Sequence, residues 1–169
     1  MKLWNLESGK VINTVDTKKW KHSSQTRVED IWTLATRMSE VVVYSLSKTS
    51  TIEKKAVLAG HKGEVKSVAF SSDTHYLATN SIDSTLKLWN LQTQSMLYSL
   101  PLESKVDCVG LEHLKDKRSA AIEKPQDLKL MVALAQDQSV RVLKVAPFSG
   151  KVQEIAQIQD AVETNIRFL

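Results

Sequence analysis

The sequence predicts an all-β protein, and three observations lead to this prediction. Short apolar runs alternate with clusters of turn-forming residues along most of the 169 positions, which is typical of many short strands. Two copies of Lys-Leu-Trp-Asn-Leu, at positions 2–6 and 87–91, lie 85 residues apart, and each precedes a polar turn and a β-prone run. Helix signals are nearly absent, because the helix-tolerant stretch around 120–123 stops at Pro125. An extended loop is therefore expected at 114–129.

Strands are expected wherever a β-prone run lies between two turn signals. The inner runs are apolar over several consecutive positions, which indicates strands that are covered on both faces. Read in chain order, the predicted strands are 2–6, 11–16, 28–34, 40–46, 53–58, 65–70, 75–80, 85–90, 95–100, 106–112, 130–135, 139–145, 151–158 and 162–169.

The repeated motif has two weaker copies, at 41–46 and 140–145. The corresponding positions in the four copies are 40, 45 and 54 residues apart, and they are Trp4, Tyr44, Trp89 and Leu143. A period of this size indicates a repeat architecture in which each unit is one small sheet.

One unit carries a further signature. It opens with Gly60-His61, contains Asp83 in a tight turn, and closes with Trp89-Asn90. This segment resembles a WD-repeat (WD40) unit, with Asn90 where the family usually has Asp. The resemblance implies a partial WD40-repeat β-propeller, with about four blade equivalents of four-stranded antiparallel sheet.

The resemblance also implies a division of residues 1–169, which together form one partial propeller. Only 22 residues separate His22 from Tyr44, against 28 from His61 to Trp89, so about one short strand and a turn are expected to be missing from the second unit. Because the first unit begins at a blade's third strand, the ring is expected to stay open. The expected units are 1–16, the end of a blade; 17–57, a degenerate blade; 58–100, a well-formed WD blade; 101–158, a divergent blade with the inserted loop 114–129; and 159–169, the start of a further blade.

The family pattern implies a buried structural tetrad in the well-formed blade, made of His61, Thr79, Asp83 and Trp89. A buried Asp needs donors, which a His ring nitrogen and turn amides supply, and the second ring nitrogen can meet the Thr hydroxyl and through it the indole N–H. Counting from the turn, the Thr position holds Leu34 and Ala133 in the neighbouring units, which lack the set.

A His, an Asp and a hydroxyl could also suggest a hydrolase. However, Thr79 is predicted in the middle of a strand, without the Gly-rich elbow that exposes a nucleophile, so no catalytic residue and no enzyme activity is expected. The single cysteine, Cys108, and the scattered His22, His75 and His113 give no metal-ligand spacing, and no phosphate-binding Gly motif occurs. We therefore expect no metal, no cofactor and no small-molecule substrate.

The expected function is a non-catalytic protein–protein interaction scaffold within a multi-protein complex. Loops and strand edges would bind the other proteins of the complex, and the candidate contact residues are Lys62, Glu64, Ile82, Ser84 and Asp107. The sequence shows no leader pattern and no apolar run of about 18 residues, so a soluble protein of the nucleus or cytoplasm, without membrane contact, is expected.

An alternative function remains open, because the net charge is +4 and a basic segment lies at 17–27. In this alternative the chain is a WD-repeat subunit of an RNA-processing or RNA-modifying complex, of the kind that acts in ribosome assembly or tRNA methylation. The candidate RNA contacts are Lys18, Lys19, Trp20, Lys21 and Arg27, where the indole could stack on a base.

Overall fold

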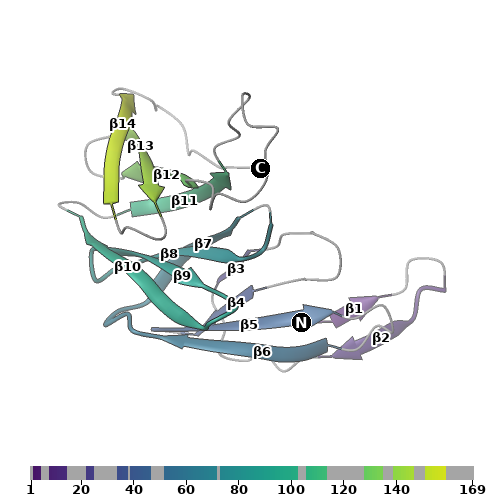
Figure 1. The fold of residues 1–169 in the computed structure, drawn as a ribbon. Helices are drawn as coiled ribbons and strands as arrows, with labels where there is room; N and C mark the ends of the chain where they lie inside the picture. The colour runs from purple at the N-terminus through teal and green to yellow at the C-terminus, as the bar shows by residue number, and fades with distance from the viewer. Residues whose placement is uncertain are drawn as a thin grey trace, which may run out of the picture.

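The computed structural model describes residues 2–4, 8–14, 22–24, 34–37, 39–46, 52–71, 73–102, 106–113, 128–134, 139–146 and 151–158. Every regular element in this part of the chain is a β-strand, and all strand pairs are antiparallel (Figure 1). The fold is therefore all-β, as predicted.

The strands form four sheets in which neighbours in the sequence are neighbours in space. A two-stranded sheet pairs β1 (Lys2–Trp4) with β2 (Val11–Thr14). The first four-stranded sheet contains β3 (His22–Ser24), β4 (Leu34–Arg37), β5 (Glu40–Leu46) and β6 (Ile52–Ala59). The middle sheet contains β7 (Val65–Phe70), β8 (Tyr76–Ser81), β9 (Thr85–Asn90) and β10 (Ser95–Pro101). The last sheet contains β11 (Val106–His113), β12 (Leu128–Leu134), β13 (Ser139–Ala146) and β14 (Lys151–Ile158).

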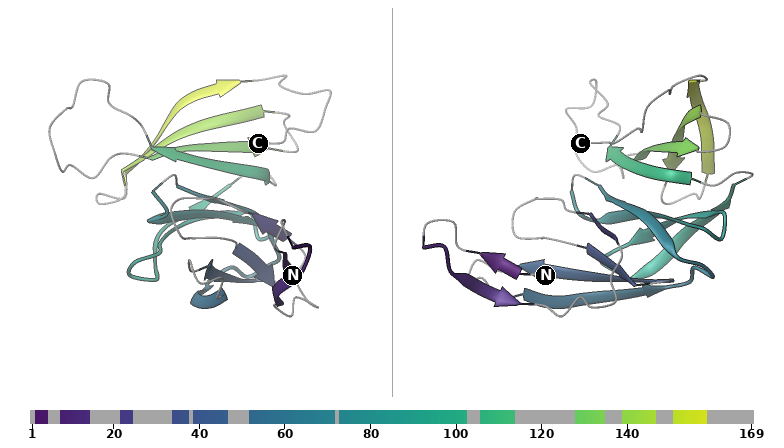
Figure 2. Two further views of the ribbon diagram at one scale, coloured as in Figure 1. Left: turned by 90° about the vertical axis from the view of Figure 1, so that its right-hand side faces the viewer. Right: turned by 180° about the vertical axis from the view of Figure 1, so that it is seen from behind.

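The three four-stranded sheets pack on one another in chain order, with the middle sheet between the other two (Figures 1 and 2). Their first strands lie together, since β7 contacts both β3 and β11. Sheets whose innermost strands meet while the other strands extend outward are arranged like neighbouring blades of a β-propeller.

The middle sheet is buried on both faces, which explains the long apolar runs in its strands. One face packs on the first sheet through the buried side chains of Val41, Val43, Ala56, Leu58, Val65, Val68, Phe70, Leu77 and Trp89. The other face packs on the last sheet through Tyr76, Ala78, Leu86, Leu88, Val109, Leu143 and Val145. Successive residues such as Leu77 and Ala78 point to opposite faces of a strand, so both members of each pair reach a core.

The sequence repeat is also a repeat in strand register. In all four sheets the pairing between the last two strands shifts by one residue, and each shift adjoins one of the four predicted repeat positions, Trp4, Tyr44, Trp89 and Leu143. Trp4 pairs with Val11 and Trp89 with Met96, so the two strong copies use the same register. A β-bulge at a fixed position is a designed feature of a fold, and this one supports the assignment of the two weak copies.

A short polar link joins the middle sheet to the last sheet at their first strands. Asn80, which is fully buried, accepts hydrogen bonds at Oδ1 from the Ser67 backbone N–H (2.7 Å) and the Ser67 hydroxyl (2.8 Å). The Ser67 oxygen in turn accepts the backbone N–H of Val109 at 2.9 Å. The link fixes one sheet relative to the next with directional bonds, in addition to the apolar contact between them.

Most predicted strands agree with the structure to within two residues. One expectation was wrong: no strand is missing from the second unit, because β3, β4, β5 and β6 form a complete four-stranded sheet with two short members. The strand β3 was not predicted, since its residues His22, Ser23 and Ser24 give no apolar signal. The predicted strands at 28–33 and 162–169 and most of the loop 114–129 lie outside the described residues.

Candidate functional site

The four tetrad residues lie in one chain of hydrogen bonds in the middle sheet. The indole N–H of Trp89 donates to the Thr79 hydroxyl oxygen (2.9 Å), and that hydroxyl lies 2.7 Å from His61 Nε2. His61 Nδ1 lies 3.1 Å from Asp83 Oδ2. The chain thus runs from the core beside the first sheet to the turn between β8 and β9.

Charge assigns the protons in this chain. Burial lowers the pKa of His61 despite the nearby Asp83 carboxylate, so its ring is neutral at pH 7. Burial alone would raise the pKa of Asp83, but hydrogen bonds from the Thr85 hydroxyl, the Lys62 backbone and His61 lower it to about 2. An ionised Asp83 accepts the Nδ1 proton of His61, and Nε2 then accepts the Thr79 hydroxyl proton.

Two further donors hold Asp83 and were not predicted from the sequence. The backbone N–H of Lys62 donates to Oδ2 at 2.7 Å. Thr85 donates to Oδ1 through both its backbone N–H (2.9 Å) and its hydroxyl (2.7 Å). The Thr85 contact is an Asx turn closed by a residue two positions after the Asp, and the Asp-Ser-Thr order in the sequence was the signal for it.

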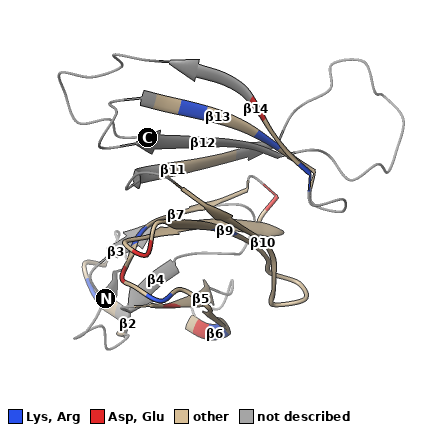
Figure 3. Ribbon diagram, turned by 90° about the vertical axis from the view of Figure 1, so that its left-hand side faces the viewer, with Lys and Arg blue, Asp and Glu red and all other residues tan. Residues whose placement is uncertain are grey.

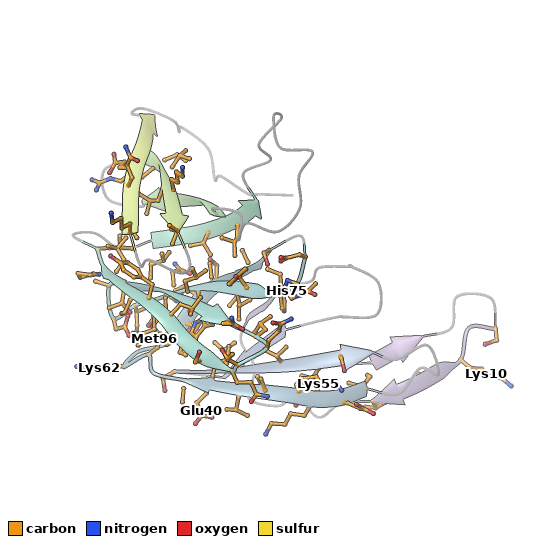
Figure 4. All side chains as sticks on the ribbon, in the orientation of Figure 1. Lys10, Glu40, Lys55, Lys62, His75 and Met96 are labelled. Carbon is orange, nitrogen blue, oxygen red and sulfur yellow. The ribbon has the colours of Figure 1, made fainter. Side chains whose placement is uncertain are left out.

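The same turn carries an exposed surface, which we name the loop surface and define as Lys62, Glu64, Ile82 and Ser84. The backbone N–H of Ile82 donates to the Glu64 carbonyl at 3.0 Å, and the left-handed Ser84 (φ 58°) accepts the Leu102 backbone N–H at 2.8 Å. The Ile82 side chain remains 47% exposed although its backbone is fixed. Figure 4 shows Lys62 and His75 at opposite ends of the middle sheet, so the loop surface occupies one end only.

Gly63 allows the two loops of this surface to touch. A Cβ atom at Gly63 would lie 2.7 Å from Ile82 Cγ1 and 3.1 Å from the backbone N of Asp83. These distances leave no room for a side chain without moving the backbone of the β8–β9 turn.

The other predicted contact residues are placed less completely. Asp107 lies in β11 at a register shift, on the strand that contacts β7, and no side-chain position is described for it. The candidate RNA contacts Lys18, Lys19, Trp20, Lys21 and Arg27 lie outside the described residues. Charged positions in the described part are spread over the three four-stranded sheets (Figure 3).

Strand pairing revises which residues replace Thr79 in the neighbouring sheets. Thr79 pairs with Lys87, two residues before Trp89; the same position is Ala35, opposite Val42, in the first sheet and Val132, opposite Arg141, in the last. Counting back from the turn had given Leu34 and Ala133, because the turns in these sheets differ in length by one residue. Neither Ala nor Val carries a hydroxyl, so the chain of bonds through Thr79 has no counterpart at these two positions.

The described residues contain no cluster of three or more His, Cys, Asp or Glu side chains that could hold a metal ion. Within the same residues, no helix has the length and apolarity needed to span a membrane.

Comparisons with known proteins agree with the arrangement of sheets. Residues 52–90 match the family model "WD domain, G-beta repeat". The chain is 42% identical over 51 residues to a ribosome biogenesis protein BOP1 homolog of Dictyostelium discoideum, covering 30% of this chain and 6% of that protein. It is 36% identical over 78 residues to the ribosome biogenesis protein erb1 of Aspergillus niger, covering 45% of this chain and 10% of that protein.

A third relative is eukaryotic translation initiation factor 3 subunit I of Meyerozyma guilliermondii, which is 35% identical over 54 residues, 32% of this chain and 16% of that protein. The chain therefore matches only a small part of the length of these curated relatives. Among solved structures, the β-propeller domain of Cps50 (Swd1) from Myceliophteria thermophila superimposes with a TM-score of 0.62 at 18% identity, over 85% of this chain and 40% of that one. The WD match and the propeller-like packing together place this chain in the WD-repeat family of β-propeller proteins.

Proposed function

We propose that the chain is a non-catalytic scaffold that binds another protein through the loop surface. The observation that carries the proposal is Ile82, an isoleucine that is 47% exposed on a turn whose backbone is fixed by hydrogen bonds to the neighbouring loop. An apolar side chain on a rigid support can enter a partner's pocket with little loss of conformational entropy. The adjacent Lys62 and Glu64 would form a polar rim.

The tetrad serves this function by holding the turn in place. Asp83 receives donors from both loops of the surface, and His61, Thr79 and Trp89 connect it to the core between the first and middle sheets. His61 is fully buried in its side chain, and Thr79 is fully buried, so neither is accessible to a substrate in solution. This geometry supports a structural role for the network.

Ile82→Asp is expected to abolish binding of the main partner while leaving the fold intact, because it places a charge at an exposed contact point. The measurement is affinity purification of the protein followed by quantitative mass spectrometry. Val57→Asp is the matched control, since Val57 is 40% exposed on β6, away from the loop surface. Equal recovery of every partner by the wild type and Ile82→Asp would contradict the proposal.

The alternative function is a subunit of a ribosome-assembly or translation complex that contacts RNA through the basic segment 17–27. Similarity to two ribosome biogenesis proteins and to a translation initiation factor subunit favours a complex of this kind. The matched stretches cover at most 45% of this chain, so they support the type of complex more than the RNA contact itself.

If residues 17–27 bind RNA, replacing Lys18, Lys19 and Lys21 by Gln should reduce the slope of log affinity against log salt concentration by about 2–3, because each lost phosphate contact removes slightly less than one unit. The measurement is a salt titration of binding to single-stranded RNA. Replacing Lys10, Lys54 and Lys66 by Gln makes the same change in charge elsewhere and should leave the slope nearly unchanged. Identical slopes for wild type and both variants would exclude this contact.

A further inference from the structure

The middle sheet contains a buried ammonium group with no carboxylate beside it. Lys87 is only 7% exposed, and its Nζ donates to the Ser99 hydroxyl at 2.8 Å and contacts the Met96 sulfur at 3.5 Å. In the described part of the chain, the ion pairs of Lys side chains involve Lys55 and Lys66 but not Lys87. A hydroxyl and a thioether are weak partners for a buried cation, which normally requires an anion.

The fold does not require a cation at this position. Lys87 pairs with Ser99, two residues before the repeat position Trp89. The same register position in the first sheet holds Val42 opposite Val57, so an apolar pair also completes the sheet there. Lys2 and Arg141 occupy the position in β1 and β13, which shows that a cation is common but not necessary.

The ammonium lies below the outer strand of the sheet, where a partner could reach it. Ser99 and Met96 are both on β10, which pairs with β9 alone, and Met96 is 48% exposed. Because the Ser99 oxygen accepts a bond from Lys87, its own O–H proton is available to an acceptor outside. Rotation of the flexible Met96 side chain would open a path to Nζ.

We propose that Lys87, Ser99 and Met96 form an acceptor site for an acidic side chain of a protein partner. The partner's Asp or Glu carboxylate would accept one hydrogen bond from Lys87 Nζ and one from the Ser99 hydroxyl, and Met96 would cover the apolar part of that side chain. The site lies on the outer strand of the sheet and is separate from the loop surface. It rests on the proposal that the chain is a scaffold and adds the chemistry of a second contact.

The test measures binding of fluorescein-labelled peptides to the full chain by fluorescence anisotropy. The probe is a peptide of repeated Glu-Gly, and the comparison peptides carry Gln or phosphoserine in place of Glu. The Glu peptide should bind and the Gln peptide should not. Lys87→Met should weaken binding of the Glu peptide about tenfold or more, since one charge-assisted hydrogen bond is lost. Lys54→Met removes the charge of an exposed lysine and should change affinity less than about twofold.

A second variant tests the site without removing the lysine. Ser99→Asp supplies a carboxylate from the chain itself, so it should block the Glu peptide as fully as Lys87→Met and raise the melting temperature by about 2–4 °C. Equal weakening by Lys87→Met and Lys54→Met, binding of the phosphoserine peptide alone, or normal peptide binding by Ser99→Asp would each overturn the inference.

The outcome is distinguishable from a failure of the loop surface. If Ile82→Asp abolishes partner recovery while Lys87→Met leaves peptide affinity unchanged, the scaffold proposal stands and the acceptor site is wrong. If the Glu peptide depends on Lys87 while Ile82→Asp recovers every partner, the acceptor site stands and the loop surface is wrong.

Discussion

Trp89→Ala is expected to lower the free energy of unfolding by about 3–5 kcal/mol, which is enough to unfold a domain of ordinary stability. The indole is only 2% exposed and packs in the core between the first and middle sheets. Its ring also meets the His61 ring edge to face, with centroids 6.4 Å apart. Removing it leaves a large cavity between two sheets and deprives the Thr79 oxygen of a donor.

Trp89→Phe separates these two effects. Phe retains most of the apolar volume but has no N–H, so the loss should fall to about 1–3 kcal/mol, the cost of a buried acceptor that lacks its donor together with a small cavity. Chemical denaturation of the wild type and both variants, followed by circular dichroism, gives the measurement. Equal losses for the two variants would show that the hydrogen bond dominates, and a loss below about 1 kcal/mol for Trp89→Ala would contradict the role of this residue in the core.

The arrangement of the middle sheet could be predicted from the sequence because its signals agree at several levels. The Gly-His pair, the turn Asp and the repeated Lys-Leu-Trp-Asn are separated by distances that only one order of strands can satisfy. In the structure the four predicted tetrad residues are joined by three hydrogen bonds, from Trp89 to Thr79, between Thr79 and His61, and between His61 and Asp83. Such spacing information is local, so it does not depend on how the sheets pack.

Other parts of the site depend on pairing, which one sequence shows poorly. The link from Asn80 through Ser67 to Val109 spans two sheets, and polar residues inside apolar strands give no signal of their partner. Strand β3 is short and polar, and it is stabilised by pairing with β4. A turn that differs by one residue moved the counterparts of Thr79 to Ala35 and Val132, because register in a strand is set by pairing and not by distance from the turn.

Asp83→Ala is expected to lower the free energy of unfolding by about 1–3 kcal/mol at pH 7, because His61, Thr85 and the Lys62 amide would each lose an acceptor. The carboxylate is 11% exposed, so water can replace it only in part. Glu53→Ala, which removes a carboxylate that is 58% exposed, is the control and should change stability little. Thermal melting of the three proteins at pH 7 provides the comparison.

The same variant should remove part of the acid sensitivity of the protein. Asp83 has a folded-state pKa of about 2 against an ordinary value of 3.8, so its contribution of about 2 kcal/mol is complete above about pH 4 and is lost as the pH falls toward 2. Burial lowers the pKa of His61 below its ordinary 6.5, so the unfolded chain binds the His proton more readily and stability also declines as the pH falls below 6.5. The wild type should therefore lose stability in two steps on acidification, first with His61 and then with Asp83. Between pH 4 and 2 the melting temperature of Asp83→Ala should fall less than that of the wild type, while Glu53→Ala should follow the wild type. Parallel curves for wild type and Asp83→Ala over this interval would show that the carboxylate does not hold the turn.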